Sequence, residues 1–433
     1  MKMKKRFRAL CFAAFIFSAF FTHAHAVPKA GETITKENWE EAKDLLPPSI
    51  LEWVKKGYYI LPVVETELNF RGGGKFEQAS RQNAGKYALD ADGVLIEKAT
   101  GKVSEFVYGL PFPEIDPSDP QAGCKIMWNF FMAQMVSNSQ QYWFDSVWVG
   151  QKGYERRIEC LWYRLFFTGR SSGPIPNPDK CYFKDLIAVT SPYDVAGVAT
   201  LLWRVFGLET DQFWSYAPAL RRVRKLPPAN ASDAFLGSDY CNDDAYLFRG
   251  KIQTFDWKLL RQGEVLACLG SVEGQLLQRD DKAEGWRIRP DYPHVVFGYE
   301  APDFKGAPWA PTNTVYAVRP AYILEGTPKD PFYNYGKQIF WMDQEAFYPY
   351  YKMVHNRSGE YWKTMVQDLI LVHLPGQEKE ETWPGPGLQM MYDDRTGHAS
   401  CCHPTSPKFL TLYASQKLTE DDFSMKALMR AGK

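Results

Sequence analysis

The sequence has 433 residues, of which 45% are hydrophobic and 15% aromatic, and this composition excludes an intrinsically disordered protein. Lysine plus arginine and aspartate plus glutamate each total 51, so the net charge is zero and no general attraction to nucleic acid is expected. The length allows a large core, and the many aromatic rings could fill that core or line a cavity.

The first 26 residues have the layout of a secretory signal peptide. A cluster of basic residues precedes an apolar segment from Ala9 to Phe21, and Ala24-His25-Ala26 is a small-residue cleavage motif. We therefore expect cleavage before Val27 and export of residues 27–433. The cysteine in the apolar segment has no lipidation motif around it, so a soluble protein is expected. No later apolar run approaches the roughly 20 residues of a membrane helix.

Two helical features are predicted before residue 145. Residues 35–56 begin with the capping residue Thr35 and are interrupted by Pro47-Pro48, so we expect two short helices that form an N-terminal extension. The segment from Cys124 to Phe144, which includes Trp128 and Phe131, is apolar nearly all round and predicts a buried helix. The same pattern also fits a lid or plug over an apolar cavity.

From Tyr154 onward the sequence predicts mostly strands. Short apolar and aromatic segments alternate with glycine- and proline-containing turns, and few helical patterns interrupt them. This succession favours one large antiparallel sheet, hence a mainly β (α+β) protein. A sheet that curls without closing would offer a concave apolar face.

The stretch from Phe213 to Phe248 has the most distinctive pattern, a basic run separated by Pro227-Pro228 from an acidic segment. Its charged residues are Arg221, Arg222, Arg224 and Lys225 on the basic side and Asp239, Asp243 and Asp244 on the acidic side. Three interpretations stay open: buried ion pairs between the two sides, a charged sheet edge that resists aggregation, and contacts to an acidic lipid head group or partner. Gly237, which precedes Ser238, is expected to adopt a backbone conformation that disfavours larger residues.

Two separate motifs carry a resemblance to a known family. The first is PALRRVR followed by FLGSD and an acidic pair, and the second is the hairpin-like segment from Tyr335 to Met365, which contains Asp343. In this order they resemble the LolA/LolB-like superfamily of periplasmic outer-membrane lipoprotein-sorting proteins, and most closely the domain of unknown function 1329 family (DUF1329). The resemblance implies an incomplete β-barrel wrapped around helices, a single domain over residues 27–433, a periplasmic location and a framework role for Asp343.

The mature sequence contains seven cysteines, which are Cys124, Cys160, Cys181, Cys241, Cys268, Cys401 and Cys402. An odd number in an oxidising compartment leaves at least one thiol free or paired between chains. Cys160 with Cys181 and Cys241 with Cys268 are plausible disulfide pairs, but the sequence does not fix the connectivity.

Two patterns resemble hydrolase chemistry superficially. Residues 169–173 match the glycine-serine-glycine spacing of a nucleophile elbow, but Pro174 and the prolines after it preclude the helix that should present the serine. Asp343 with Glu345 and Glu360 could form a carboxylate pair for hydrolysis. A polar turn and a framework aspartate are the favoured interpretations.

The histidines and the C-terminal cysteines are candidate metal ligands. Cys401-Cys402-His403, with His398 nearby, could bind zinc or copper, but adjacent cysteines lack the spacer that lets both chelate one ion. His294, His355 and His373 lie in strand-like segments without a recognisable ligand spacing. We expect no metal, no cofactor and no catalytic residues.

These observations favour a periplasmic carrier or chaperone for a lipid, a lipoprotein or another hydrophobic molecule, working with inner- and outer-membrane transport components. The candidate cavity residues are Trp128, Phe131, Trp203, Trp214, Tyr216, Phe235, Phe248 and Trp257. Two alternatives stay open. One is a structural or adaptor subunit of an envelope complex, which would have a filled core and an exposed interaction patch. The other, less favoured, is a hydrolase with a perturbed acid or nucleophile in a polar cleft.

Overall fold

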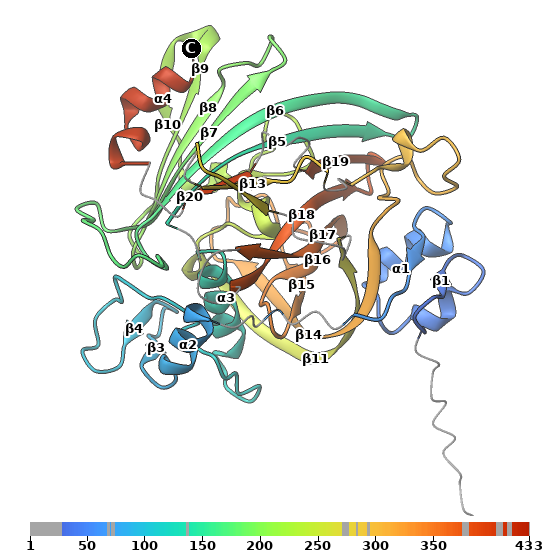
Figure 1. Ribbon diagram of the computed structural model, residues 1–433, viewed down its shortest axis with the longest axis horizontal. Helices are drawn as coiled ribbons and strands as arrows, with labels where there is room; N and C mark the ends of the chain where they lie inside the picture. The colour runs from blue at the N-terminus through green and yellow to red at the C-terminus, as the bar shows by residue number, and fades with distance from the viewer. Residues whose placement is uncertain are drawn as a thin grey trace, which may run out of the picture.

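The computed structural model describes residues 28–66, 70, 74–135, 138–270, 277–282, 285–291, 295–374, 381–403, 410–413 and 418–432. The expected signal peptide and His294 lie outside the described residues. Most of the described chain forms one strongly curved sheet, and short helices lie against its faces and ends (Figure 1). The predicted mainly β fold with a curved antiparallel sheet is therefore confirmed.

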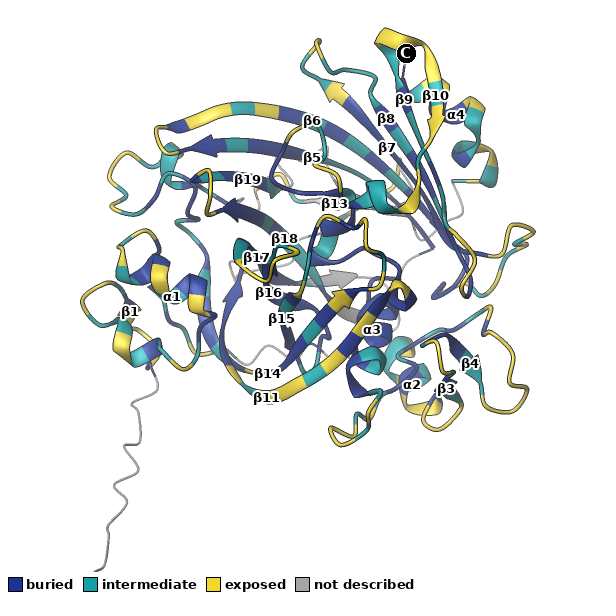
Figure 2. Cartoon of the chain, turned by 180° about the vertical axis from the view of Figure 1, so that it is seen from behind, coloured by how far each residue is buried: buried dark blue, intermediate teal, exposed yellow. Residues whose placement is uncertain are grey.

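The first half of the sheet, here called the arch, contains six strands in consecutive order. They are β5 (Ser139–Gly150), β6 (Gly153–Phe166), β7 (Cys181–Ser191), β8 (Ala199–Val205), β9 (Gln212–Ala217) and β10 (Arg222–Lys225). Each strand pairs antiparallel with the next. Strand β10 forms the outer edge, and β9 is its only strand neighbour in the described part of the chain (Figure 2).

The second half, here called the C-terminal lobe, continues the same sheet. Its main strands are β11 (Phe255–Leu269), β14 (Val315–Pro328), β15 (Gln338–Asp343), β16 (Pro349–His355), β17 (Tyr361–Leu374), β18 (Glu381–Asp393) and β19 (His398–His403). Strand β19 pairs with β5 and joins the two halves, and β16 pairs with both β15 and β17. The one parallel contact between named strands of the described chain links β11 to β17. The sheet curls but stays open at β10, as expected for an incomplete barrel.

The remaining elements are short. Strands β12 (Leu277–Asp280), β13 (Gly285–Ile288) and β20 (Leu410–Tyr413) extend the large sheet, and β1 (Thr33–Ile34), β2 (Leu61–Pro62), β3 (Tyr87–Leu89) and β4 (Leu95–Glu97) form two small sheets. The α-helices are α1 (Pro48–Lys55), α2 (Lys75–Gln82), α3 (Ala122–Ala133) and α4 (Met425–Ala431). None of the helices within the described ranges combines the length and apolar character needed to cross a membrane.

The N-terminal helical segment follows its sequence signals. A 3-10 turn at Trp39–Ala42 is followed by α1, whose first residue Pro48 occupies the position where a missing backbone N–H costs least. Trp53 of α1 is buried against Trp309 and Tyr392, with ring centroids 4.8 and 5.3 Å away. The expectation of two short helices in residues 35–56 is confirmed.

The predicted helix from Cys124 to Phe144 is correct in its first half and wrong in its second. Helix α3 ends at Ala133, and the residues from Ser139 belong to strand β5, in which Tyr142 pairs with Trp162 of β6. A run that is apolar on every side carries no periodicity that separates helix from strand, and aromatic residues such as Tyr142 favour a sheet.

The predicted disulfides are absent, since all seven cysteines of residues 27–433 are free. Cys160 pairs with Val189 near the end of β7, whereas Cys181 is the first residue of that strand. Cys241 lies before a 3-10 turn, and Cys268 is buried in β11. The members of each proposed pair are successive cysteines in the sequence, but the fold does not place them together. Burial raises the pKa of the Cys181 thiol to about 12, which keeps it protonated and unreactive at neutral pH.

Candidate functional site

Helix α3 packs between the arch and the C-terminal lobe through aromatic rings. On the arch side, Phe131 lies 5.3 Å from Tyr182 and 6.1 Å from Phe183, and Trp128 lies 5.7 Å from Tyr182, measured between ring centroids. On the lobe side, the rings of Phe130 and Tyr348 are 5.5 Å apart. We call the contact of Trp128 and Phe131 with Tyr182 and Phe183 the aromatic seam.

Beside the seam, the concave face of the arch carries a buried ion-pair network. Arg164 of β6 and Asp185 of β7 are cross-strand neighbours, and Nε and Nη2 of the arginine donate to the two carboxylate oxygens at 2.6 and 2.7 Å. Arg249 Nη1 donates to Asp185 Oδ2 at 3.1 Å. The guanidinium of Arg164 also lies 4.2 Å from the ring of Phe183, so the network touches the seam directly.

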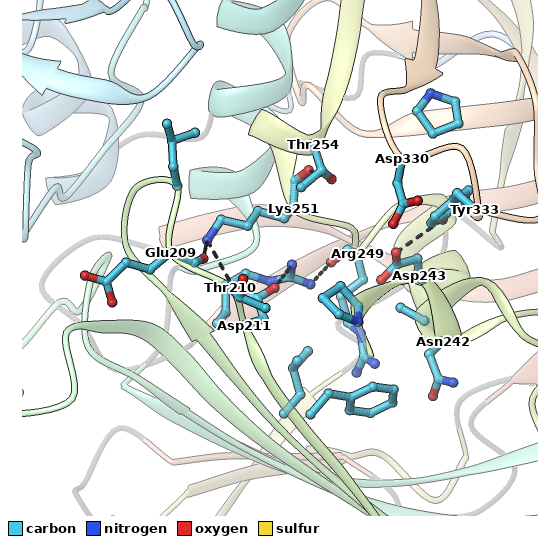
Figure 3. A pocket seen from close by; sticks show the side chains of 18 residues that line it. Glu209, Thr210, Asp211, Asn242, Asp243, Arg249, Lys251, Thr254, Asp330 and Tyr333 are labelled. Atoms are coloured by element: carbon cyan, nitrogen blue, oxygen red, sulfur yellow. Dashed lines mark hydrogen bonds and ion pairs between the residues drawn. The ribbon is translucent and has the colours of Figure 1, made fainter. Parts of the chain in front are cut away.

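A cleft of about 130 Å³ opens next to this network (Figure 3). Lys251 Nζ donates to the carbonyl oxygen of Val205 at 3.1 Å and lies 3.5 Å from Asp211 Oδ1. Arg204 contacts the same aspartate. On the opposite wall, Tyr333 donates its hydroxyl hydrogen to Asp243 at 3.2 Å. We call the site lined by Arg204, Asp211, Asp243, Arg249 and Lys251 the charged cleft.

Burial perturbs the ionisable groups of the charged cleft. It lowers the pKa of Arg249, which Asp185 only partly offsets, and it lowers the pKa of Lys251, which Asp211 partly offsets. Burial also raises the pKa of Asp243, although the neighbouring arginines oppose this. The cleft therefore holds charged groups that are poorly hydrated and suited to binding an ion.

The acidic residues of the central motif are not paired with its arginines. Asp244 contacts Lys352 of β16 and accepts a hydrogen bond from Tyr335 at 2.8 Å. Asp239 Oδ2 lies 2.7 Å from both His398 Nδ1 and Ser400 Oγ of β19. The predicted ion pairs are therefore wrong.

The two sides of the motif diverge because Pro227-Pro228 and a 3-10 turn at Pro228–Ser232 redirect the chain. Arg222 and Arg224 lie exposed on edge strand β10, and Arg221 is exposed just before it (Figure 2). This placement matches the alternative of a charged sheet edge.

The acidic segment itself forms a tight turn. Gly237 has a φ of +84°, in the region that disfavours larger residues, as expected. Ser238 donates its hydroxyl hydrogen to the carbonyl oxygen of Phe235 at 2.7 Å and stabilises the same turn.

The eight candidate cavity residues do not line one cavity. Trp203, Trp214 and Tyr216 project from the outer face of the arch and pack beneath α4, where Trp203 Nε1 donates to the carbonyl oxygen of Phe423 at 2.9 Å. Side chains alternate between the faces of a strand, so these three point away from the charged cleft.

The other candidates occupy three further places. Phe248 and Trp257 pack edge-to-face in the main core with ring centroids 5.0 Å apart, and Phe235 packs in a separate cluster near Trp162. Trp128 and Phe131 lie in the aromatic seam.

Asp343 has the framework environment that the resemblance implied. It is fully buried, its Oδ2 accepts from Arg319 Nε and from Tyr350 at 2.7 Å each, and its Oδ1 accepts from the backbone N–H of Glu345 at 2.8 Å. Glu360 lies elsewhere and accepts a hydrogen bond from Asn356 Nδ2. Glu345 accepts from Nη2 of the same Arg319 at 2.8 Å, so this arginine forms ion pairs with both Asp343 and Glu345, and Glu360 is not part of the group.

The remaining chemical candidates adopt structural roles. Arg170, in the middle of the elbow-like segment, is buried and donates to the carbonyl oxygens of Asn138 and Phe166 at 2.7 and 3.0 Å. Cys401 and Cys402 are consecutive residues of β19 and pack into different clusters on its two faces. One metal ion could therefore not be shared by both thiols.

The family model "Protein of unknown function (DUF1329)" matches residues 33–429. The chain belongs to this family. No curated protein matches the sequence.

Three solved structures are similar to this DUF1329 protein at low sequence identity. A putative outer-membrane lipoprotein-sorting protein domain from Vibrio parahaemolyticus is 18% identical with a TM-score of 0.48, and the match covers 72% of this chain and all of the other. A DUF1329 family protein from Desulfovibrio piger is 16% identical with a TM-score of 0.45 and the same coverage. A LolA superfamily protein from Nitrosomonas europaea is 16% identical with a TM-score of 0.39, over 69% of this chain and 96% of the other.

A sequence pattern indicates the buried charged network of this DUF1329 protein, although the candidate residues predicted above do not include it. Arg164, Asp185 and Arg204 each interrupt an apolar strand, in LWYRLFF, YFKDLIAV and LLWRVF. A charge inside a strand that is buried on both faces requires a partner. Arg249 and Lys251 lie outside strands, and nothing in their local sequence indicated that they join the same site.

Proposed function

We propose that this DUF1329 protein is a non-enzymatic carrier or chaperone that binds a hydrophobic molecule in the aromatic seam. The observation that carries the proposal is the position of α3. Ten of its twelve residues are buried, and its rings occupy the space between the arch and the C-terminal lobe. A hydrophobic ligand would take the place of the contact between α3 and β7.

The contacts around α3 support opening at the seam. At its N-terminal end, α3 lies against β11. The two are so close that a Cβ on Gly123 would lie 2.9 Å from the backbone nitrogen of Leu259. Asn129 further anchors α3 by exchanging two hydrogen bonds with the backbone of Phe112. The contacts described above between α3 and β7 are ring contacts, each contributing about 0.5–1.5 kcal/mol beyond the area it buries.

A ligand that covers the opened rings would recover the free energy lost on opening, at about 25 cal/mol per Å² of apolar surface. Helix α3 would then act as an internal plug that stays attached through Gly123 and Asn129 while Trp128 and Phe131 move. The lid or plug alternative for this segment is the one we favour.

The cellular setting is part of the same proposal. The signal-peptide layout of residues 1–26 and membership of the family support an exported protein that works in the periplasm. Its partners would be a hydrophobic ligand or lipoprotein and components of the inner and outer membranes. A structural or adaptor subunit is the alternative, and the exposed basic strand β10 would then be its docking surface.

Native mass spectrometry of protein purified from the periplasm, followed by organic extraction, tests the proposal directly. We expect an acyl or polycyclic hydrophobe to be bound. Failure to detect one, together with no binding of a fluorescent lipid, would favour the adaptor subunit.

Quenching of tryptophan fluorescence by a brominated acyl chain locates the binding site. We expect a Trp128→Phe variant to lose most of the quenching, because Trp128 lies in the seam. A Trp203→Phe variant serves as the matched control and should retain it, because Trp203 lies on the opposite face of the arch beneath α4. Equal loss in both variants would contradict binding in the seam.

A further inference from the structure

The buried charges at the concave face of the arch do not balance. Four cations are Arg164, Arg204, Arg249 and Lys251, and three carboxylates are Asp185, Asp211 and Asp243. All seven residues are buried except Asp211, whose side chain is 12% exposed. Two further acids line the cleft, but Glu209 is exposed and Asp330 is only partly buried, so solvent screens their charges. One positive charge is left in a region of low hydration, where a bound anion would stabilise it.

Two arginines in the charged cleft also retain unused donors. The Nη atoms of Arg204 bind Asp211 and the carbonyl oxygen of Arg249, and Arg249 Nη1 binds Asp185. The Nε atoms of both arginines are buried and have no hydrogen-bond partner among the described residues. These side chains are only 4% and 3% exposed, so the two N–H groups lack ready access to bulk water. A guanidinium is the group best suited to bind phosphate or carboxylate.

The size and charge of the cleft suit a small polar group. Its volume of about 130 Å³ accommodates a phosphate or carboxylate, and its charged walls disfavour an acyl chain. We therefore place the hydrophobic part of the ligand elsewhere.

The aromatic seam begins at the wall of the cleft. The ring of Phe183 lies 5.8 Å from the guanidinium carbon of Arg204 on one side and 6.1 Å from the ring of Phe131 on the other. A second connection runs through Val205, which accepts the hydrogen bond of Lys251, to the next residue Phe206, whose ring is 4.4 Å from that of Tyr182.

We propose that the charged cleft binds the phosphate or carboxylate head group of an amphiphile whose apolar chain occupies the aromatic seam. This inference rests on the proposed carrier function and names the chemical class of its ligand. The head group would accept hydrogen bonds from the free Nε–H groups of Arg204 and Arg249 and would neutralise the excess positive charge.

Isothermal titration calorimetry with three dodecyl compounds tests the proposal on the wild-type protein, below the concentration at which each forms micelles. We expect dodecyl phosphate to bind at least roughly tenfold more tightly than dodecanol, and dodecyltrimethylammonium to bind more weakly than dodecanol. Equal binding of all three would overturn the head-group site while leaving the carrier function intact. Failure of all three to bind would overturn both.

Inorganic phosphate alone distinguishes a head group from a free anion. We expect it to bind much more weakly than dodecyl phosphate, because the chain contributes the seam contacts. Equal affinity for the two would show a site for a free anion and would overturn the amphiphile.

A Lys251→Gln variant, with its thermal unfolding checked against wild type, localises the head group. It should lose roughly tenfold in affinity for dodecyl phosphate and none for dodecanol. Arg222→Gln, which removes one positive charge from the exposed edge strand, is the matched control and should change neither affinity. An equal loss in both variants would show a nonspecific charge effect and would contradict the site.

Discussion

His398 Nδ1 lies 2.7 Å from Asp239 Oδ2, and this contact ties the turn at residues 235–239 to strand β19. The other ring nitrogen of His398 lies 3.3 Å from Glu155 Oε2 at the start of β6. The hydrogen bond to Asp239 raises the pKa of the imidazole, burial opposes this, and Glu155 adds to the rise. A protonated His398 therefore connects three segments that are distant in the sequence.

The first prediction concerns the pH dependence of this contact. A histidine whose pKa is raised on folding contributes stability that is complete below its unfolded pKa, near 6.5, and is lost as the pH rises through its folded pKa. We expect His398→Gln to lower the free energy of unfolding by about 1 kcal/mol at pH 6 and by less at pH 9. Denaturant titrations at the two pH values measure this, and equal losses at both would contradict it.

The second prediction concerns the buried pair of Lys352 and Asp244, whose side chains are each 1% exposed. Lys352→Met leaves the Asp244 carboxylate without its cation and should lower the free energy of unfolding by about 3–5 kcal/mol. The double variant that also carries Asp244→Asn should lose less free energy of unfolding than the sum of the two single variants, because it contains no unpaired buried charge. Chemical denaturation of all four proteins completes the cycle, and additive losses would show that the residues do not interact.

The third prediction concerns Asp368, a fully buried acid whose Oδ1 accepts the backbone N–H groups of Gly387 and Leu388 at 2.8 and 2.6 Å. Burial raises its pKa to about 7, and these hydrogen bonds only partly oppose the rise. Its contribution to stability is therefore present below about pH 4 and falls by up to about 4 kcal/mol as the pH rises to 7.

Asp368→Asn keeps an acceptor for both N–H groups and removes the titration. Relative to wild type, the variant should gain stability steadily from pH 4 to pH 7 and no further above it. Urea unfolding across this range checks the difference, and a difference independent of pH would refute the assignment.

The fourth prediction separates the exposed and the buried arginines. Arg222→Ala should change the free energy of unfolding by no more than about 0.5 kcal/mol, because the side chain is exposed on β10. Arg164→Ala should lower the free energy of unfolding by about 3–5 kcal/mol, because it removes a buried ion-pair partner of Asp185. A large loss of stability in Arg222→Ala would contradict the exposed position and favour the buried ion pairs that the sequence suggested.

The predictable parts of the fold are those that local sequence patterns determine. Alternating strands, turn glycines such as Gly237 and the break at Pro47-Pro48 depend on residues close together in the chain, and all appear in the structure. The end of α3 did not follow from the sequence, because an apolar run fits a buried strand as well as a buried helix.

The candidate site was less predictable because it depends on register and face. Trp203 and Arg204 are adjacent, yet one lies beneath α4 and the other lines the charged cleft. Which of the two faces the cavity is decided by the elements that cover each side of β8. Similarly, the acid partner of Arg164 is fixed by the pairing register of β6 and β7, which no local pattern reveals.

The insertion of β19 between β18 and β5 also sets the order in which the molecule can assemble. Strands β5 to β10 come from one continuous stretch of sequence and can pair before the rest of the chain is available. The free edge of β5, however, must wait for residues 398–403, and the outer face of β8 must wait for α4 near the C-terminus. Until then the half-formed sheet presents an unpaired apolar edge, a species prone to aggregate and to need a chaperone. A chain truncated before residue 398 should therefore fail during biogenesis even though every strand of its arch is intact.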